Sequence, residues 1–128
     1  MYSPQQEIFT ACRQKAIEVV GKNNVYDFLP GEAKYPFIYI GEAFSTDIPN
    51  KSTVSGSVYQ TIHFYHNDYK KRGTTERYIA ELRGKIRQIE RTPHFYITVI
   101  SMNSSVLPDN TTQTPLLHGV LEIGFRFN

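Results

Sequence analysis

Three residues, His63, His66 and Asp68, come nearest in type to a metal-binding set. On a β-strand successive side chains point to opposite faces, so His63 and His66 cannot converge on one ion. No other group of His, Cys or carboxylate side chains at the spacing that zinc prefers completes the set. We therefore expect polar residues near a strand end, with no metal and no cofactor.

The single cysteine, Cys12, could act as a nucleophile only beside a base and an orienting group. It falls in the apolar stripe of a predicted helix, which favours a buried, unreactive thiol. The chain has neither a glycine-rich phosphate loop nor a serine nucleophile elbow, and its carboxylates are spread out. The sequence predicts no catalytic residue, and we expect that the protein is not an enzyme.

Eight of the fourteen Lys and Arg residues lie between positions 70 and 91. Around a helical wheel, four arginines share a flank with two small residues: Arg77, Arg83, Arg87, Arg91, Ala80 and Gly84. Small residues permit close approach, and arginine is enriched in interfaces. Three interpretations remain open: a solvated helix face, a protein contact, or a sequence-independent contact with phosphates.

Two amphipathic helices are predicted. Ser3 can cap the first helix, Pro4 suits its first turn, and Gly21 is typical of its end. Its apolar stripe comprises Ile8, Phe9, Cys12, Ala16, Val19 and Val20, whereas Ile17 lies off the stripe and is expected to be exposed. The second helix is predicted over residues 74–90, where Pro93 follows its end. Its apolar seam comprises Thr75, Ile79, Leu82, Ile86 and Ile89.

Four strands are predicted, over residues 37–44, 57–65, 94–102 and 116–127, and residues 25–28 form either a short strand or an extended lead-in. In residues 57–65, Val58, Ile62 and Phe64 alternate with outward-facing Tyr59, Thr61, His63 and Tyr65. Residues 94–102 are apolar on both faces, which predicts a central strand. Residues 45–56 and 103–114 are polar and are predicted to be long loops.

The predicted order is α-β-β-α-β-β. This order indicates an α+β fold of two layers, a mainly antiparallel sheet of about four strands with both helices packed on one face. The 128 residues are long enough for a single domain, and no stretch approaches the roughly 20 apolar residues of a membrane span. The net charge of +2 is too small to indicate a nucleic-acid partner by itself.

Three motifs carry a resemblance to a known family: the lead-in Val25-Tyr26-Asp27, the segment PFIYIG at positions 36–41, and the segment HGVL at positions 118–121. With them, nearly the whole chain resembles the tail completion proteins of long-tailed bacteriophages, also called tail terminators or head–tail joining proteins. The resemblance implies a structural virion protein, made in the host cytoplasm, that caps the head-proximal end of the tail tube.

The resemblance also implies partners. These are further copies of the chain in a six-membered ring, the tail tube protein and the head connector (stopper) protein, with DNA passing through the ring and no membrane involved. The two polar segments and the basic flank are then the expected interface: Asp47, Asn50, Lys51, Thr53, Arg83, Arg87, Arg91, Asp109 and Asn110. The alternative is a small nucleic-acid-binding module that uses the basic second helix together with outward-facing Tyr59 and Tyr65.

Overall fold

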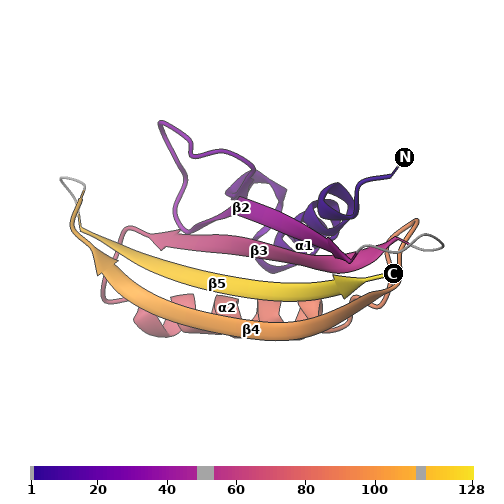
Figure 1. The fold of residues 1–128 in the computed structure, drawn as a ribbon. Helices are drawn as coiled ribbons and strands as arrows, with labels where there is room; N and C mark the ends of the chain where they lie inside the picture. The colour runs from indigo at the N-terminus through magenta and orange to yellow at the C-terminus, as the bar shows by residue number, and fades with distance from the viewer. Residues whose placement is uncertain (1, 49–53, 112–114) are drawn as a thin grey trace.

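The computed structural model describes residues 2–48, 54–111 and 115–128, which form one five-stranded sheet with two α-helices behind it (Figure 1). Along the chain the elements are α1 (Pro4–Val20), the 3-10 turn η1 (Lys22–Asn24), β1 (Val25–Tyr26), β2 (Phe37–Ile48), β3 (Ser55–His66), α2 (Arg72–Ile86), β4 (Ile97–Asp109) and β5 (Leu116–Phe127). The strand order is β1-β2-β3-β5-β4, and only the β1–β2 pair is parallel. The predicted α+β class is confirmed, and β1 is the additional strand.

The two segments predicted as long loops are mostly strand, so that prediction was wrong. β2 continues to Ile48, with Ser45 opposite Val58, and β4 continues to Asp109, with Ser105 opposite Val120. A strand is held by its backbone hydrogen-bond ladder, and a strand with one face in water needs no apolar side chain on that face. Polar composition therefore concealed two long hairpins.

The placement of residues 94–102 at the sheet centre was also wrong. β4 is an edge strand, and β5 lies between β3 and β4. The apolar residues of β4 do not require burial on both faces, because Ile97 is buried whereas Ile100 is 38% exposed. Beyond Ile97, whose amide donates to the Glu90 carbonyl at 2.9 Å, no strand among the described residues pairs with the outer backbone edge of β4.

α1 follows the prediction closely. The Ser3 hydroxyl accepts a hydrogen bond from the Gln6 amide at 3.1 Å, and Gly21 ends the helix with φ of +89°, a conformation that favours glycine. Ile8, Cys12 and Ala16 are buried against the sheet. The prediction that Ile17 is exposed was wrong, because Ile17 packs against the edge of the core.

α2 carries the predicted apolar seam but ends earlier than expected, at Ile86. Thr75, Ile79, Leu82 and Ile86 are buried along the helix. Beyond Ile86 the chain tightens into a turn in which the Ile89 amide donates to the Ile86 carbonyl at 3.0 Å, and Ile89 remains buried. Arg91 therefore does not lie on the helix, and of the four arginines predicted on its flank only Arg77, Arg83 and Arg87 are in α2.

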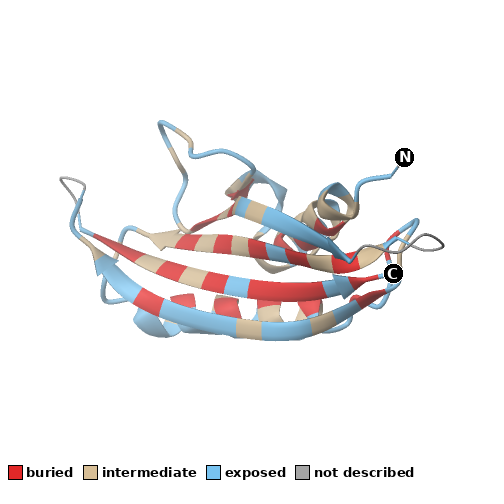
Figure 2. Cartoon of the chain, viewed as in Figure 1, coloured by how far each residue is buried: buried red, intermediate tan, exposed pale blue. Residues whose placement is uncertain are grey.

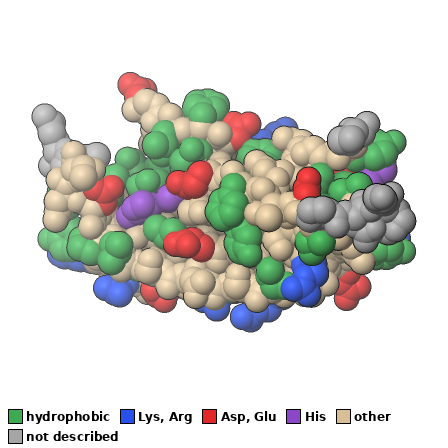
Figure 3. All heavy atoms as spheres, in the orientation of Figure 1, with side chains coloured by type: hydrophobic (Ala, Val, Ile, Leu, Met, Phe, Trp, Pro, Cys, Tyr) green, Lys and Arg blue, Asp and Glu red, His purple; other side chains and the backbone are tan. Residues whose placement is uncertain are grey.

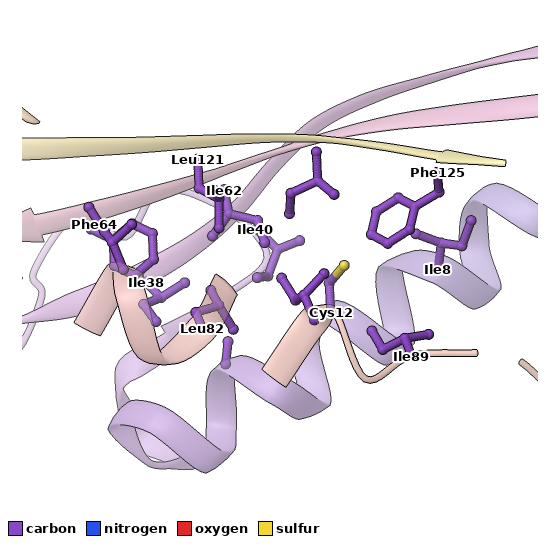
Figure 4. Close-up of a cluster of buried hydrophobic side chains, with 14 of the residues drawn as sticks. Ile8, Cys12, Ile38, Ile40, Ile62, Phe64, Leu82, Ile89, Leu121 and Phe125 are labelled. Atoms are coloured by element: carbon purple, nitrogen blue, oxygen red, sulfur yellow. The ribbon is translucent and has the colours of Figure 1, made fainter. Parts of the chain in front are cut away.

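The core lies between the helices and one face of the sheet, which we call the covered face. Buried and less buried residues alternate along β3 and β5 (Figure 2). The close-up shows side chains of α1, α2 and the strands meeting in one apolar cluster (Figure 4). Its fully buried strand residues include Val58, Ile62, Leu121, Ile123 and Phe125. The predicted alternation in β3 and β5 is confirmed.

Candidate functional site

Within the described ranges, no helix packs on the other face of the sheet, which we call the open face. The cross-strand register places rows of side chains on it, among them Phe37–Tyr65–His118–Leu107 and Tyr39–His63–Val120. Figure 3 views the molecule from this side and shows hydrophobic, histidine and acidic side chains close together over the strands. The open face therefore combines aromatic and ionisable groups without a covering layer.

Glu42, His63 and His118 form a hydrogen-bonded chain across three strands of the open face. Glu42 Oε1 lies 2.7 Å from His63 Nε2, and His63 Nδ1 lies 2.7 Å from His118 Nε2. An ionised carboxylate can only accept, so His63 donates from Nε2 and neutral His63 presents a lone pair at Nδ1. His118 then donates from Nε2, and every contact in the chain has one donor and one acceptor.

The hydrogen-bonded Glu42–His63–His118 group shifts the pKa values of Glu42 and His118. The hydrogen bond from His63 is the main reason that the pKa of Glu42 lies below its usual value. Partial burial, followed by the proximity of His63, lowers the pKa of His118, although Asp109 and Glu42 oppose that shift. Glu42 is therefore a fixed negative charge at neutral pH, held in place by His63.

Aromatic rings stack on both histidines of the Glu42–His63–His118 group. The ring centroids of Tyr65 and His118 lie 4.5 Å apart at an interplanar angle of 9°, and those of Tyr39 and His63 lie 5.5 Å apart. Farther along the sheet, Phe44 stacks on Tyr59 at 4.9 Å beside a hollow of about 290 Å³ that Glu122 also lines. Phe44 is 61% exposed, so this stack presents a ring to whatever meets the open face.

The charge on the four long strands is mainly negative. Their carboxylates are Glu42, Asp47, Asp109 and Glu122, and their only Lys or Arg is Arg126. Asp47 lies opposite Gly56 and belongs to the covered side of the sheet, so it does not add to the open face. In the middle of the open face, Glu42 and Glu122 therefore have no Lys or Arg of the strands beside them.

The basic flank lies on the helix side of the sheet. Arg83 Nη1 donates to Ser104 Oγ on β4 at 2.7 Å, and Arg83, Arg87 and Ala80 line a groove of about 310 Å³ between α2 and β4. Arg91 is separate from this groove and lies over the Tyr96 ring, 5.6 Å from its centroid. We call Arg83 and Arg87 the arginine flank from here on.

The expected interface residues that the structure describes do not gather in one place. Asp47 lies in β2 and Asp109 in β4, followed by Asn110, whereas Asn50, Lys51 and Thr53 lie outside the described residues. The ends of the β2–β3 and β4–β5 hairpins are at opposite ends of the sheet (Figure 1). Asp109 accepts hydrogen bonds from the backbone and side chain of Thr111, which are the main cause of its lowered pKa.

The residues considered for metal binding or catalysis, His63, His66 and Cys12, do not form a reactive site among the described residues. His63 lies on the open face, whereas His66, opposite Leu117, points to the other side, as predicted. Burial raises the pKa of Cys12 to about 12, which keeps the thiol protonated. Within the described ranges, no three His, Cys, Asp or Glu side chains are arranged to hold a metal ion. None of the helices found there is long and apolar enough to cross a membrane.

Sequence reasoning missed the partnership of His63 with His118, which are 55 residues apart. The alternation in each strand indicates that both side chains lie opposite the core-facing residues. Only the β3–β5 register, with Tyr65 opposite His118, brings them together. The register of two strands far apart in sequence could not be obtained from the pattern of either strand.

Comparison with known proteins gives one kind of match. No family model matches the chain, and no curated protein matches it. Among solved structures, the chain is similar to one from the structure titled "Virion of native gene transfer agent (GTA) particle", with a TM-score of 0.71 and 12% sequence identity. The match covers 99% of this chain and 98% of that chain. At this identity the two chains share a fold over their whole lengths.

Proposed function

We propose that this protein is a structural component of a virion, which caps the head-proximal end of a phage tail tube as a ring and joins the tail to the head connector. The observation that carries the proposal is the full-length fold match to a chain of a gene transfer agent virion. Both chains are covered almost completely, so the likeness is not that of a common substructure within unrelated proteins. The sequence resemblance to tail completion proteins supports the same function.

The surface suits a structural protein that binds other proteins. In the part of the chain that the structure describes, no layer covers the open face, and several large side chains on the strands are well exposed, among them Phe44, Ile48 and Leu107. Exposed large apolar side chains on a face without a covering helix are candidates for contact with another protein. A ring repeats one heterologous contact, so each copy must offer two different surfaces, and the open face and the helix side differ in both shape and charge.

The alternative, a nucleic-acid-binding module, has less support from the geometry. Single-strand binding combines aromatic stacking with cations that follow the backbone. Here the aromatic residues occupy the open face, whereas the arginine flank lies on the helix side with Ser104. Arg126, opposite Ser57, is the only basic strand residue on the open face, so the arginine flank and the aromatic rings lie on different sides of the sheet.

The test is assembly on tail tubes. Purified protein should form six-fold rings at the head-proximal ends of isolated tubes, visible by electron microscopy, and capped tubes should join filled heads. Free protein at high concentration should be compared by light scattering, because ring closure can depend on the tube as a template. Tube ends that remain uncapped at saturating protein would overturn the proposal. Salt-sensitive binding of DNA by the isolated protein would instead favour the alternative.

A further inference from the structure

We propose that neighbouring copies in the ring meet through the open face of one copy and the arginine flank of the next. This inference rests on the proposed ring and names the two surfaces that would build it. In this arrangement the open face, and not the polar segments at the hairpin ends, forms the main contact with the arginine flank. The occupant of the open face is therefore a second copy of this chain, with Arg83 and Arg87 directed toward Glu42, Glu122 and the aromatic rings.

The open face is suited to guanidinium groups. Glu42 is held by its hydrogen bond to His63, with the 2.7 Å distance given above, and it remains 72% exposed in its side chain. Glu122 lies opposite Thr61, two residues along β3 from His63, and is exposed. Arginine pairs with carboxylates through directed N–H groups and also stacks on aromatic faces. Carboxylates beside partly exposed Tyr and Phe rings supply both kinds of contact.

The arginine flank matches that surface in charge and in form. Arg87 is exposed, and Arg83 is half-buried and oriented by its hydrogen bond to Ser104. Ala80, which has a small side chain, lines the groove beside them, so an aromatic side chain of a neighbouring copy can approach α2 closely. Glu76 also lines the groove, so the flank has two positive charges and one negative charge. Its net charge is opposite to that of Glu42 and Glu122.

The two surfaces lie on different sides of the molecule. Ser104 lies opposite Leu121 on the covered side, which places the arginine flank beside the β4 edge and away from the open face. A contact between unlike surfaces is heterologous, and its repetition produces a closed ring or an open helix rather than a simple two-fold dimer. One copy cannot satisfy its own flank, since the sheet separates the two surfaces.

The experiment uses two complementary charge-reversed proteins. In the first, Glu42→Lys and Glu122→Lys make the open face positive; in the second, Arg83→Glu and Arg87→Glu make the flank negative. Each protein alone juxtaposes like charges, which costs several kcal/mol in an interface, so self-association should weaken at least about 100-fold. Mixed in equal amounts, the two proteins should assemble in alternation, because both kinds of junction are again complementary.

Native mass spectrometry and sedimentation would be run on each protein, on the mixture and on the wild type, both free and with tail tubes. The matched control is Glu32→Lys with Arg72→Glu, two exposed positions outside both surfaces, which should assemble as the wild type does. Thermal melts of all variants establish that each is folded. The strength of wild-type association should also fall as salt rises from 0.05 to about 0.5 M, since exposed ion pairs are screened.

The outcomes separate this inference from the proposed function. Wild-type protein that neither self-associates nor caps tubes overturns the proposed function. Wild-type rings together with normal assembly of either reversed protein alone overturn the inference only. If both reversed proteins fail alone and also fail when mixed, the two surfaces do not face each other, and the inference is likewise overturned.

Discussion

The two faces of the sheet are made by alternate residues of the same strands, yet they have different tasks. On β3, Ile62 and Phe64 are buried against the helices, whereas the neighbouring His63 and Tyr65 lie in the open-face network. Because side chains alternate at every residue, the composition of one face can change without altering the other. The comparison shows that burial in the core and exposure on the open face are separated here by one position along the chain.

The largest expected effect tests the covered face. Leu82 is fully buried, and Leu82→Ala should lower the free energy of unfolding by about 2–5 kcal/mol, because it removes packed methyl groups and leaves a cavity. Leu107→Ala is the matched change on the open face, where Leu107 is 55% exposed, and it should stay within about 0.5 kcal/mol. Urea unfolding of both variants measures the difference. Equal losses would remove the contrast between the faces.

Two glycines of β5 provide a second, smaller contrast. A Cβ atom at Gly119 would lie 2.8 Å from Ile79 Cδ1 and 3.2 Å from Phe64 Cβ, both in the packed core. Gly119→Ala should therefore cost about 1–3 kcal/mol through overpacking. At Gly124, on the open face, the added Cβ would contact Ser101 Oγ and lie 3.0 Å from Tyr59 Cε1.

Ser101 and Tyr59 are exposed and can rotate away, so Gly124→Ala should cost less than Gly119→Ala. Thermal unfolding of the two variants side by side measures the order. A larger loss at Gly124 than at Gly119 would mean that the open face is as tightly packed as the core, contrary to the comparison.

The smallest effect concerns pH and belongs to the open face. Burial lowers the pKa of His118 in the folded protein, so between the unfolded value of about 6.5 and that lowered value the unfolded chain binds more protons. The stability due to neutral His118 is complete above about pH 6.5 and is lost as the pH falls below it. Glu42, with its own lowered pKa, acts in the same direction at lower pH.

Unfolding free energies from urea melts at pH 7.5 and pH 5.0 test this linkage. The wild type should lose stability over this interval, and His118→Gln should lose less, because glutamine does not titrate. Parallel losses in the two proteins would show that protonation of His118 is not linked to folding.

Much of the fold followed from local patterns in the sequence. The cap at Ser3, the end at Gly21 and the seam of α2 each depend on residues within a few turns of one helix. The inward face of β3 was likewise evident from the alternation that includes Val58 and Ile62. These features are set by short-range stereochemistry and by the burial of apolar side chains, which a single sequence displays directly.

The errors in the sheet share a physical cause, whereas those on Ile17 and on the end of α2 concern the helices. Residues 45–48 and 103–109 are in strands because their backbones pair with β3 and β5, and their side chains give little sign of it. The same backbone pairing decides that β4 is at the edge and β5 is inside. The Glu42–His63–His118 chain depends on that register too. In the sheet, what sequence reasoning missed was therefore the pairing between strands, since the choice of partner strand leaves no periodicity in either sequence.

The strand order has a consequence for the kinetics of folding. The β2–β3 and β4–β5 hairpins each join neighbouring segments, whereas the β3–β5 seam joins Gly56 to Phe127 and His66 to Leu117 across α2 and β4. Closing a long chain segment costs entropy before its contacts form. The two hairpins can therefore form early, and the pairing of β3 with β5 forms last. Ile62 and Leu121, which face each other across that seam, then control when the two halves of the chain become one cooperative unit.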